Sequence, residues 1–469
     1  MFYQDPFHSP LLNLARHVAW RSVLIGGLLF VPYGPPATGQ TFKTLVNFDG
    51  TNGDLPIYTS LIQGTDGDLY GTTYLGGTSC CGTVFKVAPA GGLTTLYSFD
   101  LTHGGYPWGG LIQGVGGDFF GTTTGGGSNA FGTVFKITSH GTLTTLHSFD
   151  STDGQVPLGS LIQAAGGSLY GVTSGGGAYG FGTIFMIAPG GALTTVHSFN
   201  QTDGQNPYAG LIQGVNGNLY GTTEEGGPNH SGTLFEITTA GVLTTLYGFG
   251  SSDGYLYCAL VQDFDGTLYG TTENGGQYGY GTVFSFTSLG TLTTLHSFAL
   301  SDGAYPYAGL VRGTDGNFYG TTQFGGAYGD NGTVFSITPE GALTTLHSFN
   351  STDGDAPEAG LLQATNGIFY GTTTSGGDHG YGTVFSLDVG LGAFVRTQPH
   401  SGKIGDTISI LGNNLIGTTS VSFNGTPATF TVVSATQITA TVPSGATTGS
   451  IQVTTPSGTL SSAGPFLVR

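Results

Sequence analysis

Short runs of apolar and β-branched residues recur along this chain at intervals of about 50 residues. The copy between Gly210 and Phe249 contains four of them, and their Val, Ile, Thr, Tyr and Phe content predicts four β-strands. These runs are Leu211–Gln213, Leu219–Thr223, Gly232–Thr238 and Leu243–Phe249. The aromatic residue that opens the Y-G-T-T motif marks seven copies, at Tyr70, Phe120, Tyr170, Tyr220, Tyr269, Tyr319 and Tyr370.

The links between the runs predict how the strands pair. Asn216-Gly217 separates the first two runs and supplies the positive φ of a tight hairpin turn, so these strands are expected to be antiparallel. A short Gly-containing turn, Ala240-Gly241, joins the last two, whereas the remaining two links are long. Four antiparallel strands in 40 to 50 residues is the size of one propeller blade. The pattern therefore predicts an all-β fold, a seven-bladed β-propeller over residues 40–393, rather than a solenoid of shorter coils.

The two ends of the repeat region complement each other. A single run of the fourth type, Thr41–Phe48, precedes the first copy, and the seventh copy lacks its fourth run after Leu387. Pairing Thr41–Phe48 with Gly382–Leu387 would close the ring and cover both exposed strand edges.

A different pattern begins near Phe394. Period-two alternation with turn residues every eight to twelve positions predicts a small β-sandwich over residues 394–469. Four motifs resemble the IPT/TIG immunoglobulin-like family: Pro399-His400-Ser401-Gly402, I-x-I-x-G-x-x-L from Ile408, V-x-F-N-G-x-x-A from Val421, and V-P-x-G-A from Val442. The resemblance implies a non-catalytic module of extracellular and surface proteins. Residues 392–397 fit either the propeller or this tail domain.

The repeats themselves resemble the Gloeobacter/Verrucomicrobia tandem repeat. The resemblance rests on the L-Y-G-T-T, G-G-x-x-x-x-G-T-V-F and L-T-T-L-x-S-F motifs and covers residues 42–387. It implies an extracellular bacterial protein and carries no assigned activity.

Charge and the N-terminal segment narrow the function classes. The formal net charge is −18, and only nine Lys and Arg are spread along the chain, which argues against nucleic-acid or anionic-membrane partners. Residues 1–39 hold Arg16 and Arg21, an apolar run Val23–Val31 too short to span a membrane, and the small-residue sequence Ala37-Thr38-Gly39. They resemble a secretory signal, and an extension from a misassigned start is the alternative. We expect a monomer that is secreted, periplasmic or at the cell surface, without a transmembrane span in the mature chain.

The metal-ligand residue types do not form a recognisable set. Cys80-Cys81 fits either two loop thiols or an adjacent disulfide, and Cys258 is expected to be a small buried residue. Recurring Asp-Gly pairs lack calcium-loop spacing and predict Asx turns, and one His per repeat predicts packing positions on separate blades. No metal or cofactor is expected. These recurring residues are Asp153, Asp203, Asp253, Asp302 and Asp353, and His147, His197, His296 and His347.

Aromatic residues gather in the long links, which should emerge on one face of the propeller. Such side chains suit stacking on sugar rings, and the alternative is that they only pack in the interfaces between neighbouring blades. The candidate ligand-binding residues are Trp108, Tyr106, Tyr208, Tyr257, Tyr305 and Tyr307, with Arg312, which replaces the Gln of other copies.

Three acidic residues break the repeat pattern in adjacent links: Glu224, Glu225 and Glu273. Paired carboxylates could serve a glycosidase, and solvated loop acids are the simpler interpretation. The sequence therefore predicts a binding or scaffold protein for extracellular glycan or protein. A polysaccharide-active hydrolase or lyase using these acids is the alternative.

Overall fold

The computed structural model describes residues 40–58, 60–164 and 167–469, and within them every regular element is a β-strand. The predicted export segment, residues 1–39, lies outside the described residues. Among the described residues, there is no helix of the length and apolarity that a membrane span requires.

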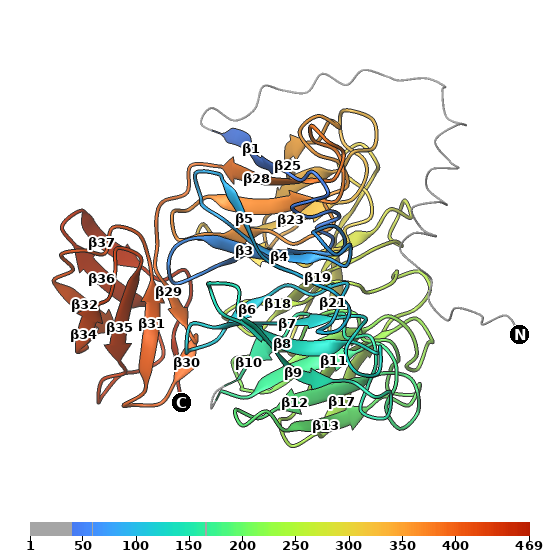
Figure 1. Ribbon diagram of the computed structural model, residues 1–469, viewed down its shortest axis with the longest axis horizontal. Coiled ribbons are helices and arrows are strands. Elements are labelled where there is room, and N and C mark those ends of the chain that lie inside the picture. The colour runs from blue at the N-terminus through green and yellow to red at the C-terminus, as the bar shows by residue number, and fades with distance from the viewer. Residues whose placement is uncertain (1–39, 59, 165–166) are drawn as a thin grey trace, which may run out of the picture. The chain divides into compact units, whose positions relative to one another are not determined.

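Six consecutive copies of the repeat each form a four-stranded antiparallel sheet, and their strands pair in chain order (Figure 1). The first three sheets are β2 (Ile62–Gln63), β3 (Leu69–Thr73), β4 (Thr83–Val87) and β5 (Leu93–Ser98); β6 (Ile112–Gln113), β7 (Phe119–Thr123), β8 (Thr133–Ile137) and β9 (Leu143–Ser148); and β10 (Ile162–Gln163), β11 (Leu169–Thr173), β12 (Thr183–Ile187) and β13 (Leu193–Ser198). The next three are β14 (Ile212–Gln213), β15 (Leu219–Thr223), β16 (Thr233–Ile237) and β17 (Leu243–Gly248); β18 (Val261–Gln262), β19 (Leu268–Thr272), β20 (Thr282–Phe286) and β21 (Leu292–Ser297); and β22 (Val311–Arg312), β23 (Phe318–Thr322), β24 (Thr333–Ile337) and β25 (Leu343–Ser348). The sheets form a propeller-like arrangement, as the strand pattern predicted.

The seventh copy takes its fourth strand from the start of the chain. Its own strands are β26 (Leu362–Gln363), β27 (Phe369–Thr373) and β28 (Thr383–Asp388), and β1 (Thr41–Asn47) pairs antiparallel with β28. The predicted pairing of these two segments is confirmed (Figure 1). Phe48, which follows β1, is fully buried and packs edge-on against Phe85 of the first sheet at 5.3 Å between ring centroids.

The Y-G-T-T and G-T-V-F motifs meet inside each sheet. In the second copy, a Cβ placed on Gly121 would lie 2.6 Å from Phe135 Cζ, so the Phe ring occupies the space that a side chain would need. Nearby, Thr123 Oγ1 and Thr133 Oγ1 form a buried hydrogen bond of 2.8 Å. The same Gly–Phe and Thr–Thr contacts recur in all seven copies, which explains why these residue types repeat.

Consecutive copies are joined by two further recurring contacts. The Gly that opens the G-T-V-F motif packs against a Pro of the following link, as Gly132 does against Pro157. The Gln of the first strand accepts a hydrogen bond from the hairpin turn of the preceding copy, as Gln113 Oε1 does from Thr65 N at 3.0 Å. Both contacts also join the seventh copy to the first, through Gly382 with Pro56 and through Thr365 N with Gln63 Oε1 at 2.9 Å.

The C-terminal segment forms two four-stranded sheets and one two-stranded sheet. One four-stranded sheet holds β29 (Arg396–Gln398), β31 (Thr407–Leu411), β35 (Gln437–Thr441) and β34 (Phe430–Val432); the other holds β33 (Thr426–Pro427), β32 (Ser420–Phe423), β36 (Ile451–Thr455) and β37 (Gly458–Ser461); and β30 (Ser401–Gly402) pairs with β38 (Leu467–Val468). Side chains of both larger sheets, including Ile410 and Val453, share one buried core. Because β29 pairs with β31, Arg396 and Thr397 belong to this region rather than to the repeats.

The cysteines are free thiols. Cys80 is exposed and Cys81 is buried, with their sulfur atoms 2.8 Å apart as a hydrogen bond rather than a disulfide. Cys258 is buried, as predicted, and its Sγ donates to Thr271 O and accepts from Thr271 N.

Candidate functional site: the Tyr–Glu cluster

One position of the repeat brings unlike side chains together. It lies three residues before the Leu that precedes the first strand of each sheet, and we call its seven residues the pre-strand set. The pre-strand set is Tyr58, Trp108, Leu158, Tyr208, Tyr257, Tyr307 and Glu358. This position combines Tyr, Trp, Leu and Glu, so the repeats differ chemically here.

In six of the seven links, a non-glycine residue with a positive φ lies shortly before the pre-strand residue. In the second copy Tyr106 has a φ of 62°. Its N–H donates to Cys81 O of the preceding copy at 2.8 Å, and its carbonyl accepts from Thr124 N at 3.1 Å. The corresponding residue has a positive φ in six of the seven links, at Leu55, Tyr106, Val156, Asn206, Tyr305 and Ala356. A non-glycine residue in this region costs on the order of 1 kcal/mol or more, so the surrounding hydrogen bonds must hold it there.

The residues that follow the pre-strand set are small because successive links crowd together. A Cβ on Gly109 would lie 2.8 Å from the carbonyl of Gly159, and a Cβ on Gly159 would lie 2.7 Å from that of Ala209. The same crowding joins the last link to the first, since a Cβ on Gly360 would lie 2.6 Å from Ser60 Oγ. The chain therefore brings pre-strand residues of different copies into contact.

Aromatic members of the set form one continuous chain of rings. Tyr58 stacks on Trp108 with centroids 4.7 Å apart and meets Tyr307 edge-on at 5.7 Å. Tyr307 lies 5.6 Å from Tyr257, which lies 5.1 Å from Tyr208. Tyr307 is buried, whereas the other four rings remain partly exposed. These four residues therefore leave the cluster partly open to solvent.

A second repeated position supplies polar partners to these rings. It directly follows the Y-G-T-T motif, at Tyr74, Thr124, Ser174, Glu224, Glu273, Gln323 and Thr374. In three copies its side chain bonds to the pre-strand residue of the next copy. Tyr257 donates its hydroxyl to Glu224 Oε1, Tyr307 donates to Glu273 Oε1 at 2.5 Å, and Gln323 Nε2 donates to Glu358 Oε1. We call the pre-strand aromatic residues and these acids the Tyr–Glu cluster.

Burial controls the charge state of the cluster. It raises the pKa of Glu224 to about 7, against which the Tyr257 hydrogen bond acts, while the charges of Glu225 and Glu273 raise it further. Burial likewise raises the pKa of Glu273. Glu358 is only 6% exposed, and burial raises its pKa to about 7. Near pH 7 the Glu224 and Glu358 carboxyls are therefore partly protonated, and they lie beside tyrosines whose pKa is raised by burial.

Several predicted site residues meet in this cluster and others lie outside it. Trp108, Tyr208, Tyr257, Tyr307, Glu224 and Glu273 belong to the cluster. Tyr106 joins its edge through Tyr74, which lies 5.5 Å from Trp108. Glu225 accepts a hydrogen bond from Gln205. These bonded and partly buried acids do not fit the interpretation as solvated loop acids.

Two predicted ligand-binding residues make other contacts. Arg312 Nε lies 2.9 Å from Asp263 Oδ1, and Arg312 Cζ lies 4.3 Å from the centroid of the Phe264 ring. These contacts take the place of the Gln contact between neighbouring copies. Tyr305 is the positive-φ residue of its link and packs edge-on against Tyr280 and Phe324.

Sequence reasoning missed Tyr58, Tyr74 and Gln323. Between the Gly of the link and the first strand, the first copy has one residue more than every other copy except the fifth, which is shorter still, so Tyr58 does not follow its Pro directly as Trp108 does. Counting backward from the strand would have aligned Tyr58 with the other pre-strand residues.

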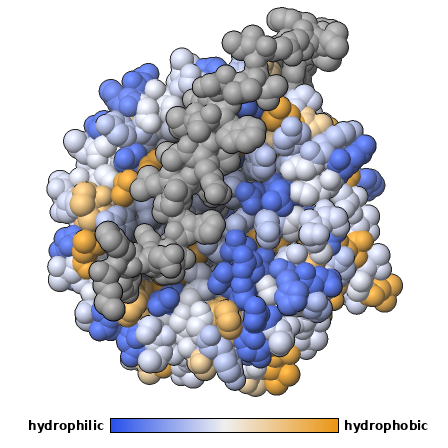
Figure 2. Space-filling view, turned by 90° about the vertical axis from the view of Figure 1, so that its right-hand side faces the viewer, coloured by the Kyte–Doolittle hydropathy of each residue, from blue (hydrophilic) through white to orange (hydrophobic). Residues whose placement is uncertain are grey.

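Figure 2 shows one face of the molecule by hydropathy. Outside the grey atoms hydrophilic residues predominate, and hydrophobic residues sit singly or in small groups, mostly toward the edge. A broad apolar surface is not seen on the visible part of this face.

The repeat sequence identifies the family. The family model described as the Gloeobacter/Verrucomicrobia repeat matches residues 31–167, 113–270 and 257–432, which together span most of the chain. The chain belongs to the Gloeobacter/Verrucomicrobia repeat family. The resemblance to this family predicted from the three repeat motifs is confirmed. No curated protein matches the sequence of this family member.

Solved structures share the fold of this Gloeobacter/Verrucomicrobia repeat protein. A fungal alcohol oxidase of the AA5 family, in complex with copper, is 14% identical with a TM-score of 0.52, covering 92% of this chain and 100% of the oxidase. The extracellular domain of a hybrid two-component system from B. thetaiotaomicron is 10% identical with a TM-score of 0.50, covering 90% of this chain and 55% of that one. At these identities the likeness shows the fold alone.

The chemistry of the Tyr–Glu cluster suits an organic ligand. Its polar groups are phenols, the Trp108 indole and carboxyls, and the described residues contain no group of three or more His, Cys, Asp and Glu arranged to hold a metal ion. Rings flanked by carboxyls can stack on the apolar face of a sugar and accept hydrogen bonds from its hydroxyls.

Proposed function

We propose that this protein is an exported binding or scaffold protein that recognises extracellular glycan through the Tyr–Glu cluster. The observation that carries the proposal is the continuous row of five rings, four of them partly exposed, in which the phenols of Tyr257 and Tyr307 bond to carboxyls of the preceding copies. Such a site combines stacking faces with hydroxyl acceptors, which are the two requirements for binding a sugar. A surface protein recognised through the same face is the second ligand class.

The proposal includes a closed seven-bladed propeller followed by an IPT/TIG immunoglobulin-like domain. The β1–β28 pairing and the Gln63 and Pro56 contacts between the seventh and first copies support closure. The two sheets around one core support a sandwich over residues 394–469. Export, with residues 1–39 as its signal, agrees with the likeness to an extracellular domain.

A glycan array tests the binding function. Protein comprising residues 40–469 should bind a defined set of oligosaccharides, and Trp108→Ala and Tyr208→Ala should each weaken that binding by about tenfold or more, as expected for losing one stacked ring. Leu289→Ala is the matched control, because Leu289 is 92% exposed in the turn between β20 and β21 and belongs to neither repeated position of the cluster. Equal binding by all four proteins, or no binding to any glycan, would reject the cluster as a sugar site.

A polysaccharide-active hydrolase or lyase is the second candidate function. It is favoured by Glu224 and Glu358, whose pKa near 7 suits a general acid. Turnover of the glycan that the array identifies should then fall by two orders of magnitude or more in Glu224→Gln or Glu358→Gln, as expected for the loss of a general acid. Binding without measurable turnover would leave the non-enzymatic function.

A further inference from the structure

Four copies of the repeat carry a His–Asp pair outside the Tyr–Glu cluster. The His lies in the fourth strand of the sheet, and the Asp lies six residues later in the following link. The Nε2–Oδ2 distances are 2.7 Å for His147–Asp153, 3.0 Å for His197–Asp203, 3.0 Å for His296–Asp302 and 3.2 Å for His347–Asp353. In each pair both side chains are about one-fifth to one-third exposed.

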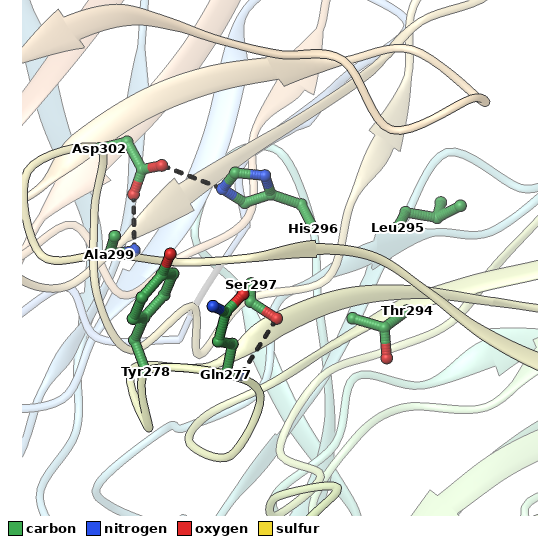
Figure 3. Close-up of a pocket in the computed structure, with 8 residues that line it drawn as sticks. All are labelled: Gln277, Tyr278, Thr294, Leu295, His296, Ser297, Ala299 and Asp302. Carbon is green, nitrogen blue, oxygen red and sulfur yellow. Dashed lines mark hydrogen bonds and ion pairs between the residues drawn. The ribbon is translucent and has the colours of Figure 1, made fainter.

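Backbone contacts fix the carboxylate of each pair. Asp302 Oδ1 accepts from Ala299 N at 2.9 Å while Oδ2 faces His296, so the carboxylate has one orientation (Figure 3). The strand is irregular here, because its register with β20 shifts between Val283 and Phe284. A bulge of this kind redirects side chains locally.

A shallow pocket of about 410 Å³ surrounds the fifth copy's pair. Gln277 and Tyr278 form one wall, and β21 with the following link forms the other; Figure 3 shows Tyr278 and Gln277 beside Ser297 and Ala299. Gln277 N donates to Ser297 Oγ at 3.3 Å, which ties the link to the strand. Tyr278 is 54% exposed, so its ring is open to a ligand rather than used in packing.

The same combination recurs in two other copies. Tyr179 occupies in the third copy the sequence position that Tyr278 occupies in the fifth, and His197 pairs with Asp203. Ala178 N donates to Ser198 Oγ at 3.3 Å, as Gln277 N does to Ser297 Oγ. Tyr328 precedes His347 and Asp353 in a link one residue longer. Tyr179 and Tyr328 are 61% and 67% exposed. Three separate copies thus combine an exposed Tyr at the same position of the link with an ordered His–Asp pair.

We propose that the third, fifth and sixth copies carry corresponding, individually weak sites for neutral polysaccharide, each built from the exposed Tyr and the His–Asp pair; in the sixth copy Phe42 of β1 also stacks on His347, at 3.7 Å between ring centroids. The Tyr ring provides a stacking face, and the His, Asp and neighbouring polar groups bond to hydroxyls. The residues lining the fifth copy's pocket include no Lys or Arg, so an anionic polymer has no counterion there. A polymer of repeating units can occupy several sites at once, and linked weak sites can exceed single-site affinity by 10²–10⁴-fold.

Retention on immobilised polysaccharide tests this proposal, which does not depend on the Tyr–Glu cluster. Cellulose, xylan and mannan serve as neutral probes and alginate as the anionic probe. Wild-type protein should be retained on at least one neutral polymer, Tyr278→Ala should bind it about tenfold more weakly, and the Tyr179→Ala, Tyr278→Ala, Tyr328→Ala triple variant should lose at least about 100-fold. The three tyrosines are exposed, so the melting temperature should not change.

Two further variants separate the possible results. Asp302→Asn keeps the size of the side chain but weakens its hold on His296, and it should reduce retention when combined with the Tyr179→Ala, Tyr328→Ala background. Leu289→Ala is the exposed control and should bind like wild type. The proposal would be overturned if the triple variant were retained as strongly as wild type, or if only Trp108→Ala lost retention. It would also be overturned if the protein preferred alginate, or if it were retained on no neutral polymer.

Discussion

Glu358 differs from its counterparts in the other copies by placing a carboxyl where they carry aromatic or aliphatic side chains. Burial, opposed by hydrogen bonds from Gln323 and Thr374, raises its pKa from 4.5 to about 7. The folded protein therefore keeps this proton to a higher pH than the unfolded chain does. The contribution to stability is complete below about pH 4.5 and is lost as the pH rises through about 7.

Glu358→Gln should remove this dependence. Relative to the variant, the free energy of unfolding of the wild type should fall by up to about 3 kcal/mol between pH 4.5 and pH 8. Urea unfolding at a series of pH values measures the difference. Glu340→Gln, which removes a carboxyl at an exposed position, is the control variant. A flat difference for Glu358→Gln would contradict the buried carboxyl with a raised pKa.

At the scale of a single sheet, the Phe ring opposite the Y-G-T-T motif leaves no room for a side chain at the Gly of that motif. A Cβ on Gly121 would lie 2.6 Å from Phe135 Cζ and 2.9 Å from Leu111 Cδ2, so Gly121→Ala should overpack the sheet and cost about 1–3 kcal/mol. Gly116 in the hairpin turn of the same sheet has no atom within 4 Å of such a Cβ and lacks a positive φ. Gly116→Ala should therefore change stability by less than about 0.5 kcal/mol. Denaturant midpoints of the two variants test the explanation, and equal midpoints would refute it.

The strands were predictable because each copy repeats the same local chemistry. The turn dipeptide Asn216-Gly217 and the runs around it predicted the pairing of β14 with β15, which the structure confirms. The start of the tail sheet was not predictable, because residues 392–397 carry neither the repeat motifs nor a complete tail motif, and only the pairing of β29 with β31 assigns them.

The candidate site was only partly predictable for a related reason. Its residues are far apart in sequence, and their contacts depend on how successive links converge. Link aromatics such as Tyr208 and Tyr257 stand out in the sequence, but nothing local indicates that Glu224 bonds to Tyr257 of the next copy. The His–Asp pairs were missed because His296 and Asp302 each had a separate explanation, in packing and in an Asx turn.

At the scale of the whole molecule, β1 is the one strand that joins the beginning of the repeat region to its end. Its loss would leave the edge of β28 unpaired and remove Phe48 from the core shared with Phe85 and Val384. Removing a buried Phe alone costs about 3–5 kcal/mol. Unpaired edges also favour association between chains.

Protein lacking Thr41–Asp49 should therefore melt at least about 5 °C below protein that begins at Gln40, and it should form dimers or larger species. Calorimetry and size-exclusion chromatography measure the two effects. A synthetic peptide of residues 41–49 should restore part of the melting temperature, because it can pair with β28 as β1 does. A peptide with Phe48→Ala should restore less, since Phe48 is fully buried. An unchanged melting temperature after the deletion would show that the stability of the repeat region does not depend on this strand.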